Sequence, residues 1–174
     1  MKMDNQELAS LPIFNTFKPY QIELIKPFME FCSFPGDMVI FNQGDRAENF
    51  FILTAGEIAL RFKPYDGPSL VITKVSEGGV FGWSAALGRS TYSAAAVTTS
   101  NIKVIRIRAD HLEKLCKIDH ETAALFLDRL VGVISEKLQD SHYEILSLFS
   151  NGMNLTNECK RRMNINGSEN RIYA

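Results

Sequence analysis

The apolar residues change their spacing twice along the chain, and these changes predict helices at both ends with strands between them. Residues 8–31 carry apolar positions at helical spacing. Pro19 and Pro27 interrupt this segment, and proline lacks the backbone donor and clashes with the preceding turn. We therefore expect two short helices here rather than one long one. The apolar positions are Leu11, Ile22, Leu24, Ile25, Phe28 and Phe31.

Residues 34–108 contain short runs of β-branched and aromatic residues, separated by glycine and proline. In the last run, apolar residues alternate with Arg106 and Arg108, which is typical of a half-buried strand. Short strands at regular spacing predict an antiparallel jelly-roll-like barrel, here of eight strands. With flanking helices, the fold class is α+β. The runs are Met38–Phe41, Phe50–Ala55, Glu57–Phe62, Leu70–Val75, Ala94–Thr98 and Ile102–Arg108.

Two helices are expected after the barrel. Asp110 with Glu113 three residues later resembles a capping box at the start of a short helix. Asp119 is placed to cap a second, long helix that ends near Phe149. Gly152 then provides a stop, because glycine tolerates the left-handed conformation after a helix.

The long helix, residues 119–149, carries a heptad pattern that predicts a homodimer. A second apolar stripe beside the seam is available to cover the barrel, whereas a helix packed on its own domain needs one stripe. We therefore expect two copies of the chain to associate through the seam. The seam is Leu127, Val131, Ile134, Leu138, Ser141, Ile145 and Leu148, and the second stripe is Phe126, Leu130 and Val133.

The domain is expected to cover residues 8–149, followed by a polar, flexible tail over residues 150–174. This tail is too short for a winged helix-turn-helix. The formal net charge is −1, which gives no electrostatic attraction to nucleic acid or to anionic membrane. Direct DNA binding is therefore not expected, and regulation would run through a protein partner that the sequence does not identify.

Cellular placement and thiol chemistry follow from what the sequence lacks. No run approaches eighteen apolar residues, and residues 1–10 have no apolar run of the secretory kind. A cytoplasmic protein is the simple interpretation. Cys32, Cys116 and Cys159 are far apart and form no C-x-x-C pair, which argues against a disulfide framework or a zinc site.

Short motifs in a fixed order run from the first helical segment through the predicted barrel, and all but the first contain glycine. Pro12-Ile13-Phe14 comes first, and a glycine-rich stretch, GGVFGWSAALGRSTYS, ends the series at residues 78–93. Together these motifs resemble the cyclic-nucleotide-binding domain of catabolite activator proteins, protein-kinase regulatory subunits and gated channels. The motifs between them are Phe34-Pro35-Gly36-Asp37, Ile40-Phe41-Asn42-Gln43-Gly44-Asp45 and Phe50-Phe51-Ile52-Leu53-Thr54-Ala55-Gly56-Glu57-Ile58.

The resemblance implies that residues 81–94 form a phosphate-binding cassette, and this cassette departs from the family pattern at two positions. The family has glutamate, which takes the ribose hydroxyl, where Trp83 stands. It has arginine, which takes the cyclic phosphate, where Tyr92 stands. Tyrosine offers one neutral O–H, and the tryptophan indole only donates. Losing the charge-assisted bonds forfeits about 4–8 kcal/mol, or three or more orders of magnitude in affinity.

Part of the cassette is retained. Gly82 allows close backbone approach, and residues 84–87 are placed to form a short helix whose first N–H groups point into the cradle. Ser93 and Arg89 are further candidates for an anion. No cofactor is certain, and a cyclic nucleotide is expected to bind weakly at best. The predicted ligand-binding residues are Phe81, Gly82, Trp83, Ser84, Ala85, Arg89, Tyr92 and Ser93.

Two interpretations of Trp83 and Tyr92 remain open. They either fill the vacated pocket or line an aromatic pocket for a different small molecule. We predict a non-enzymatic small-molecule sensor or regulatory module with an altered cassette. The alternatives are a transcription-regulator-like cyclic-nucleotide receptor and a ligand-free structural interaction protein. Enzyme motifs are absent from the sequence, and His111, His120 and His142 all lie outside the barrel segment.

Overall fold

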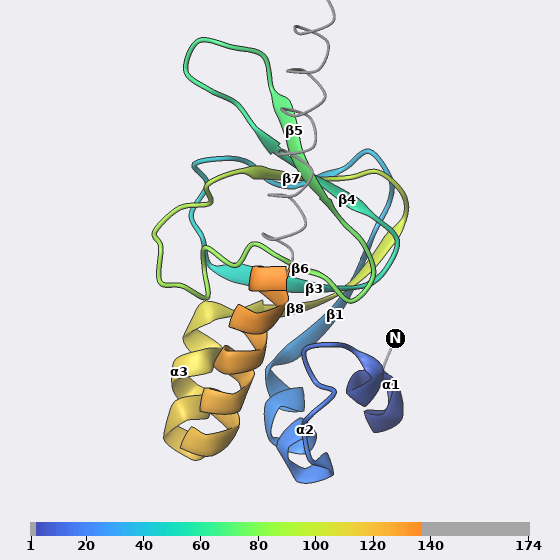
Figure 1. Cartoon of the computed structure of the whole chain (residues 1–174), viewed down its shortest axis with the longest axis vertical. Helices are drawn as coiled ribbons and strands as arrows, with labels where there is room; N and C mark the ends of the chain where they lie inside the picture. Colours follow the sequence, from blue (N-terminus) through green and yellow to red (C-terminus); the bar gives the residue numbers. More distant parts are fainter. Residues whose placement is uncertain (1–2, 137–174) are drawn as a thin grey trace, which may run out of the picture. The chain divides into compact units, whose positions relative to one another are not determined.

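Short helices flank two antiparallel sheets in the computed structural model of the chain, which describes residues 3–136 (Figure 1). The N-terminal helices precede the first strand, and the others follow the last strand as an antiparallel pair. The helices are α1 (Asn5–Ser10), α2 (Pro19–Ile25), the 3-10 turn η1 (Lys26–Phe28), α3 (Ala109–Ile118) and a helix over residues 120–136.

The sheets contain four strands each, in the orders β1-β8-β3-β6 and β2-β7-β4-β5, and all strand pairs are antiparallel. The prediction of eight antiparallel strands with flanking helices is confirmed. The strands are β1 (Met29–Phe34), β2 (Val39–Phe41), β3 (Asn49–Ala55), β4 (Ile58–Phe62), β5 (Leu70–Val75), β6 (Val80–Phe81), β7 (Ala95–Thr98) and β8 (Ile102–Arg108).

The helical prediction for residues 8–31 is correct for α2 and wrong for residues 11–18, most of which form turns, and for residues 29–31. Pro19 is the first residue of α2, and Pro27 lies in η1, so the two prolines separate short helices as expected. Residues 29–31 instead belong to β1, which pairs with β8 along its whole length. In this pairing Glu30 lies opposite Arg106, and the carboxylate accepts two bonds from the guanidinium.

Strand β3 separates two hydrophobic cores, because successive side chains of a strand point to opposite faces. Phe50 and Ile52 belong to the core that the helices cover. Phe51 and Leu53 belong to the core between the two sheets. All four side chains are almost fully buried.

The two helix starts predicted after the barrel have different outcomes. Asp119 caps the helix over residues 120–136, since its carboxylate accepts a bond of 3.1 Å from the Thr122 backbone N–H. The predicted capping box at Asp110 is wrong, because α3 begins after Arg108 and no side chain caps it. Asp110 instead pairs with Arg108 and Lys114, and these hydrogen bonds lower the pKa of its carboxyl to about 2.

The helix over residues 120–136 packs residues of both predicted stripes on the domain, since Leu127 and Ile134 of the seam are partly buried against the helix-covered core. Phe126 and Leu130 are fully buried against the helix-covered core, as predicted for the second stripe. Val131 of the seam is 53% exposed. The remaining seam positions, Leu138, Ser141, Ile145 and Leu148, and the tail over 150–174 lie outside the described residues. Within residues 3–136, no helix is long and apolar enough to span a bilayer.

Candidate functional site

The predicted cassette begins where β6 ends and the chain turns sharply at Gly82. Gly82 has a φ of 70°, a conformation that L side chains rarely adopt. A Cβ there would lie 3.1 Å from the Asn49 carbonyl oxygen and about as close to the rings of Phe51 and Phe41. Glycine is therefore required at this position both for its backbone conformation and for its size.

Residues 83–88 form a single turn rather than the short helix predicted from residue 84 onward. The Arg89 N–H donates to the Ser84 carbonyl and the Gly88 N–H donates to the Ala85 carbonyl. Gly88 has a φ of 71°, so these bonds form the Schellman motif that terminates helices. The turn ends before a helix can develop.

Tyr92 points into the barrel and is only 5% exposed. Its hydroxyl donates to the Asn49 carbonyl at 2.6 Å and accepts from the Asn49 N–H at 3.2 Å. The ring stacks on Phe41 with centroids 3.7 Å apart and an interplanar angle of 17°. Burial raises the pKa of the Tyr92 phenol, and the bond with the Asn49 backbone opposes this in part.

Tyr92 extends a stack of phenylalanine rings inside the barrel. Phe51 and Phe81 stack with centroids 4.9 Å apart, and Phe41 lies 6.0 and 6.2 Å from these two rings. Such ring pairs contribute about 0.5–1.5 kcal/mol each beyond the area that they bury. Tyr92 is thus held in place by packing as well as by its hydroxyl.

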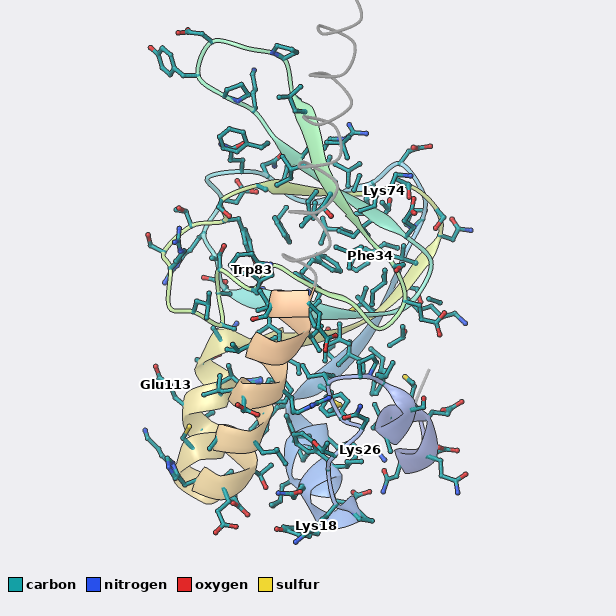
Figure 2. The ribbon with its side chains drawn as sticks, viewed as in Figure 1. Lys18, Lys26, Phe34, Lys74, Trp83 and Glu113 are labelled. Carbon is teal, nitrogen blue, oxygen red and sulfur yellow. The ribbon has the colours of Figure 1, made fainter. Side chains whose placement is uncertain are left out.

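A cavity of about 60 Å³ remains beside Tyr92 and Trp83, far smaller than the 300–1,000 Å³ of typical small-molecule sites. Trp83 is half-buried at one side of the barrel (Figure 2). None of the lining side chains carries a formal charge. The cavity is lined by Phe41, Leu60, Ile72, Gly82, Trp83, Ser84, Tyr92, Ser93 and Ala94.

The structure brings five of the eight predicted ligand-binding residues to the cavity, namely Gly82, Trp83, Ser84, Tyr92 and Ser93. The other three do not line it. Phe81 and Ala85 are buried in the core between the sheets, and Arg89 is exposed.

The sequence prediction missed Phe41, Leu60, Ile72 and Ala94, which also line the cavity. They come from three different strands and from the segment before β7. The side-chain alternation of β4 is the signal that points Leu60 inward. No motif marks Ile72. Within residues 3–136, no group of three His, Cys, Asp or Glu residues is arranged to hold a metal ion.

Comparison with known proteins identifies one sequence family. The profile of the family described as "Cyclic nucleotide-binding domain" matches residues 31–119, about half of the chain. A cAMP-dependent protein kinase regulatory subunit from Neurospora crassa is 28% identical over 114 residues, which are 66% of this chain and 29% of the subunit. A cyclic AMP receptor protein from Thermus thermophilus is 25% identical over 68% of this chain and 57% of the receptor. The chain thus spans less than two thirds of these relatives.

Solved structures share the fold at lower identity. A cyclic nucleotide-binding domain from Methylobacillus flagellatus superposes with a TM-score of 0.75 at 18% identity, covering 82% of each chain. A mutant regulatory subunit of a cAMP-independent protein kinase A from Trypanosoma brucei, bound to cAMP, superposes with a TM-score of 0.63 at 16% identity. This match covers 82% of this chain and 49% of the other.

Proposed function

The chain belongs to the cyclic nucleotide-binding domain family, and from that premise we propose that it is a non-enzymatic regulatory module with an altered ligand site. In this proposal Trp83 and Tyr92 take the places of the glutamate and arginine that bind the nucleotide in the family. The module then does not bind cyclic nucleotides in the usual manner. Its relatives named above are regulatory subunits and a receptor protein, which supports a regulatory role.

The packing of Tyr92 is the observation that carries this proposal. Its ring occupies the space beside Phe41, and its hydroxyl is already engaged by both backbone groups of Asn49. A phosphate would have to displace these contacts and would meet no cationic side chain among the residues of the cavity. Burying an anion without a charged partner is strongly unfavourable.

One structural neighbour supports the expectation that restoring a positive charge favours cyclic-nucleotide binding. The Trypanosoma brucei protein is described as cAMP-independent, and its triple mutant is bound to cAMP. One of the three substitutions introduces arginine in place of threonine. By analogy, we infer that the neutral Tyr92 of this chain disfavours cyclic-nucleotide binding and that an arginine in its place would favour it.

Calorimetry with cyclic AMP and cyclic GMP tests the proposal. We expect the wild-type protein to bind neither ligand more tightly than about 100 μM, given the forfeited charge-assisted bonds. The double variant Trp83→Glu with Tyr92→Arg should gain affinity for at least one of them. A matched control, Leu87→Glu with Tyr65→Arg, introduces the same residue types at exposed positions and should gain none.

Three outcomes decide between the candidate functions. Submicromolar binding by the wild type would overturn the altered site and favour an ordinary cyclic-nucleotide receptor. A gain confined to the double variant would support a regulatory module with a modified cassette. A double variant that is folded by circular dichroism and binds nothing would favour a ligand-free interaction protein, an interpretation that the small cavity also supports.

We further propose that two copies associate through the heptad seam predicted for residues 119–149. Support comes from Val131, whose side chain is half exposed on the helix over residues 120–136, and from Leu127 and Ile134 of the seam, which the domain buries only in part. The net charge of −1 offers no general attraction to DNA, so the module is proposed to act on a protein partner.

A further inference from the structure

Two cationic side chains, Arg61 and Lys63, line a pocket on the outer face of the barrel that is separate from the cavity beside Tyr92. Strand β4 places Leu60 inward, against the cavity beside Tyr92. Arg61, the next residue, points to the opposite face and lines a separate outer pocket of about 490 Å³. The same alternation on β7 separates Ala94 and Ala96, which face the interior, from Ala95, which lines the outer pocket.

The outer pocket combines two cations with polar side chains and has the volume of a small-molecule site. Arg61 lies in β4 and Lys63 directly follows the strand, and both line this pocket; two residues of extended chain span about 7 Å. The pocket contains no carboxylate. Its lining residues are Asn42, Gln43, Gly44, Arg61, Lys63, Ser69 and Ala95.

Lys63 follows β4, and the side chain of Gln43 holds its backbone in place. The Gln43 amide accepts from the Lys63 N–H at 2.8 Å and donates to the Lys63 carbonyl at 3.3 Å. One side-chain amide thus reproduces the pair of bonds that a neighbouring strand would make. Fixing Lys63 in this way prepares the site, because less conformational freedom is lost when a ligand binds.

The two cations are not used elsewhere among the described residues. Neither Arg61 nor Lys63 forms an ion pair within residues 3–136. By contrast, Lys74 on the neighbouring strand β5, labelled in Figure 2, bonds to Glu57 at 2.9 Å. Asp45, the carboxylate beside the turn at residues 42–44, already accepts two bonds from Asn42.

We propose that this outer pocket binds a small phosphorylated ligand between Arg61 and Lys63. The guanidinium fork matches two phosphate oxygens, and the ammonium supplies a point charge for the third. The Ser69 hydroxyl is a further donor, because Ser69 also lines the pocket. The site differs in residues and in face from the cavity at Tyr92, so it stands whether or not that cavity binds a ligand.

Titration of the isotope-labelled full chain with inorganic pyrophosphate tests the site. Binding is monitored through the backbone amide NMR resonances at neutral pH and low ionic strength. Saturable shifts should cluster at residues 42–44, 61–63 and 69, and they should weaken as salt is added. The double variant Arg61→Gln with Lys63→Gln should bind about tenfold or more weakly. The matched control Lys74→Gln removes one paired cation from the same sheet and should leave the affinity within about twofold.

A third variant tests whether the bonds that hold Lys63 in place contribute to affinity in addition to the two charges. Gln43→Ala leaves both cations in place and removes the amide that holds Lys63, so the affinity should fall by a smaller factor than in the double variant. Shifts that do not saturate, that spread over all exposed lysines, or that persist in the double variant would overturn the proposal. A glutamate-rich peptide that binds the pocket more tightly than pyrophosphate would also overturn it, in favour of an acidic protein partner.

Discussion

The hydroxyl of Tyr92 forms hydrogen bonds with both backbone groups of Asn49, at a position where β3 no longer pairs with β6. Strand β6 pairs only with Phe51 and Ile52 of β3, because the chain turns away at Gly82. One phenolic oxygen then donates to the Asn49 carbonyl and accepts from the Asn49 N–H. An arginine at this position could not do both, since a guanidinium has no acceptor.

Removing this hydroxyl should destabilise the domain. The variant Tyr92→Phe keeps the ring stack with Phe41 but leaves the two Asn49 groups without their partner. We expect the free energy of unfolding to fall by about 1–3 kcal/mol, measured by urea denaturation. Tyr65→Phe is the control, because Tyr65 is fully exposed, and it should change stability by less than about 0.5 kcal/mol. Equal effects of the two substitutions would mean that the Tyr92 bonds contribute nothing net.

The same phenol should make the fold sensitive to alkali. Burial raises the pKa of Tyr92 in the folded chain above its ordinary value of about 10. The unfolded chain therefore loses this proton first as the pH rises. The stabilising contribution of the neutral phenol is complete below about pH 10 and is lost as the pH rises through the folded pKa.

Unfolding free energies measured near pH 8 and about pH 11 test this linkage. The decrease between the two should be larger for the wild type than for Tyr92→Phe, which has no proton to lose at this position. Absorbance titration of the tyrosines gives an independent measurement, since one of them should ionise late in the wild type and be missing from the variant. A late-ionising tyrosine in both proteins would assign the shift to another residue.

Regular interruptions by glycine and proline predicted six of the eight strands, namely β2, β3, β4, β5, β7 and β8. The sequence did not predict β1, since Phe28 and Phe31 continue a spacing that also suits a helix. The strand forms because β8, more than seventy residues later, pairs with it. Two-residue β6 carries too short a pattern to recognise and depends on Phe51 and Ile52 for its pairing.

The sequence predicted the loop residues of the candidate site but not the other residues that line its cavity. Trp83 and Tyr92 were found because the spacing of a known motif fixes their positions. Leu60 follows from the alternation of β4, whereas Ile72 comes to the cavity through a register shift in the pairing of β4 with β5, which local sequence does not encode. The predicted helix at residue 84 failed because Gly88, with its left-handed conformation, ends the turn at once.

The conformation of Gly82 leads to a prediction with an internal control. Gly82→Ala should lower the free energy of unfolding by about 1–3 kcal/mol, because the added methyl meets the Asn49 carbonyl and two rings in a left-handed backbone. Gly132→Ala lies in the helix over residues 120–136 with open space around its Cβ. That substitution should instead stabilise the protein by up to about 1 kcal/mol. Chemical denaturation of both variants checks the opposite signs, and a neutral Gly82→Ala would contradict the close packing at the turn.

Val131 permits a test of self-association that leaves the folded domain intact. Its side chain is half exposed, so Val131→Glu should disturb the core little. In a dimer through the seam of Leu127, Val131 and Ile134, however, two copies of the introduced charge would be buried without partners, at a cost of several kcal/mol. Sedimentation velocity at micromolar concentration should show a dimer for the wild type and a monomer for this variant. Gly132→Glu adds the same charge one residue away, off the seam, and this control should remain dimeric. A monomeric wild type, or a dimer that survives Val131→Glu, would mean that the heptad pattern does not form the interface.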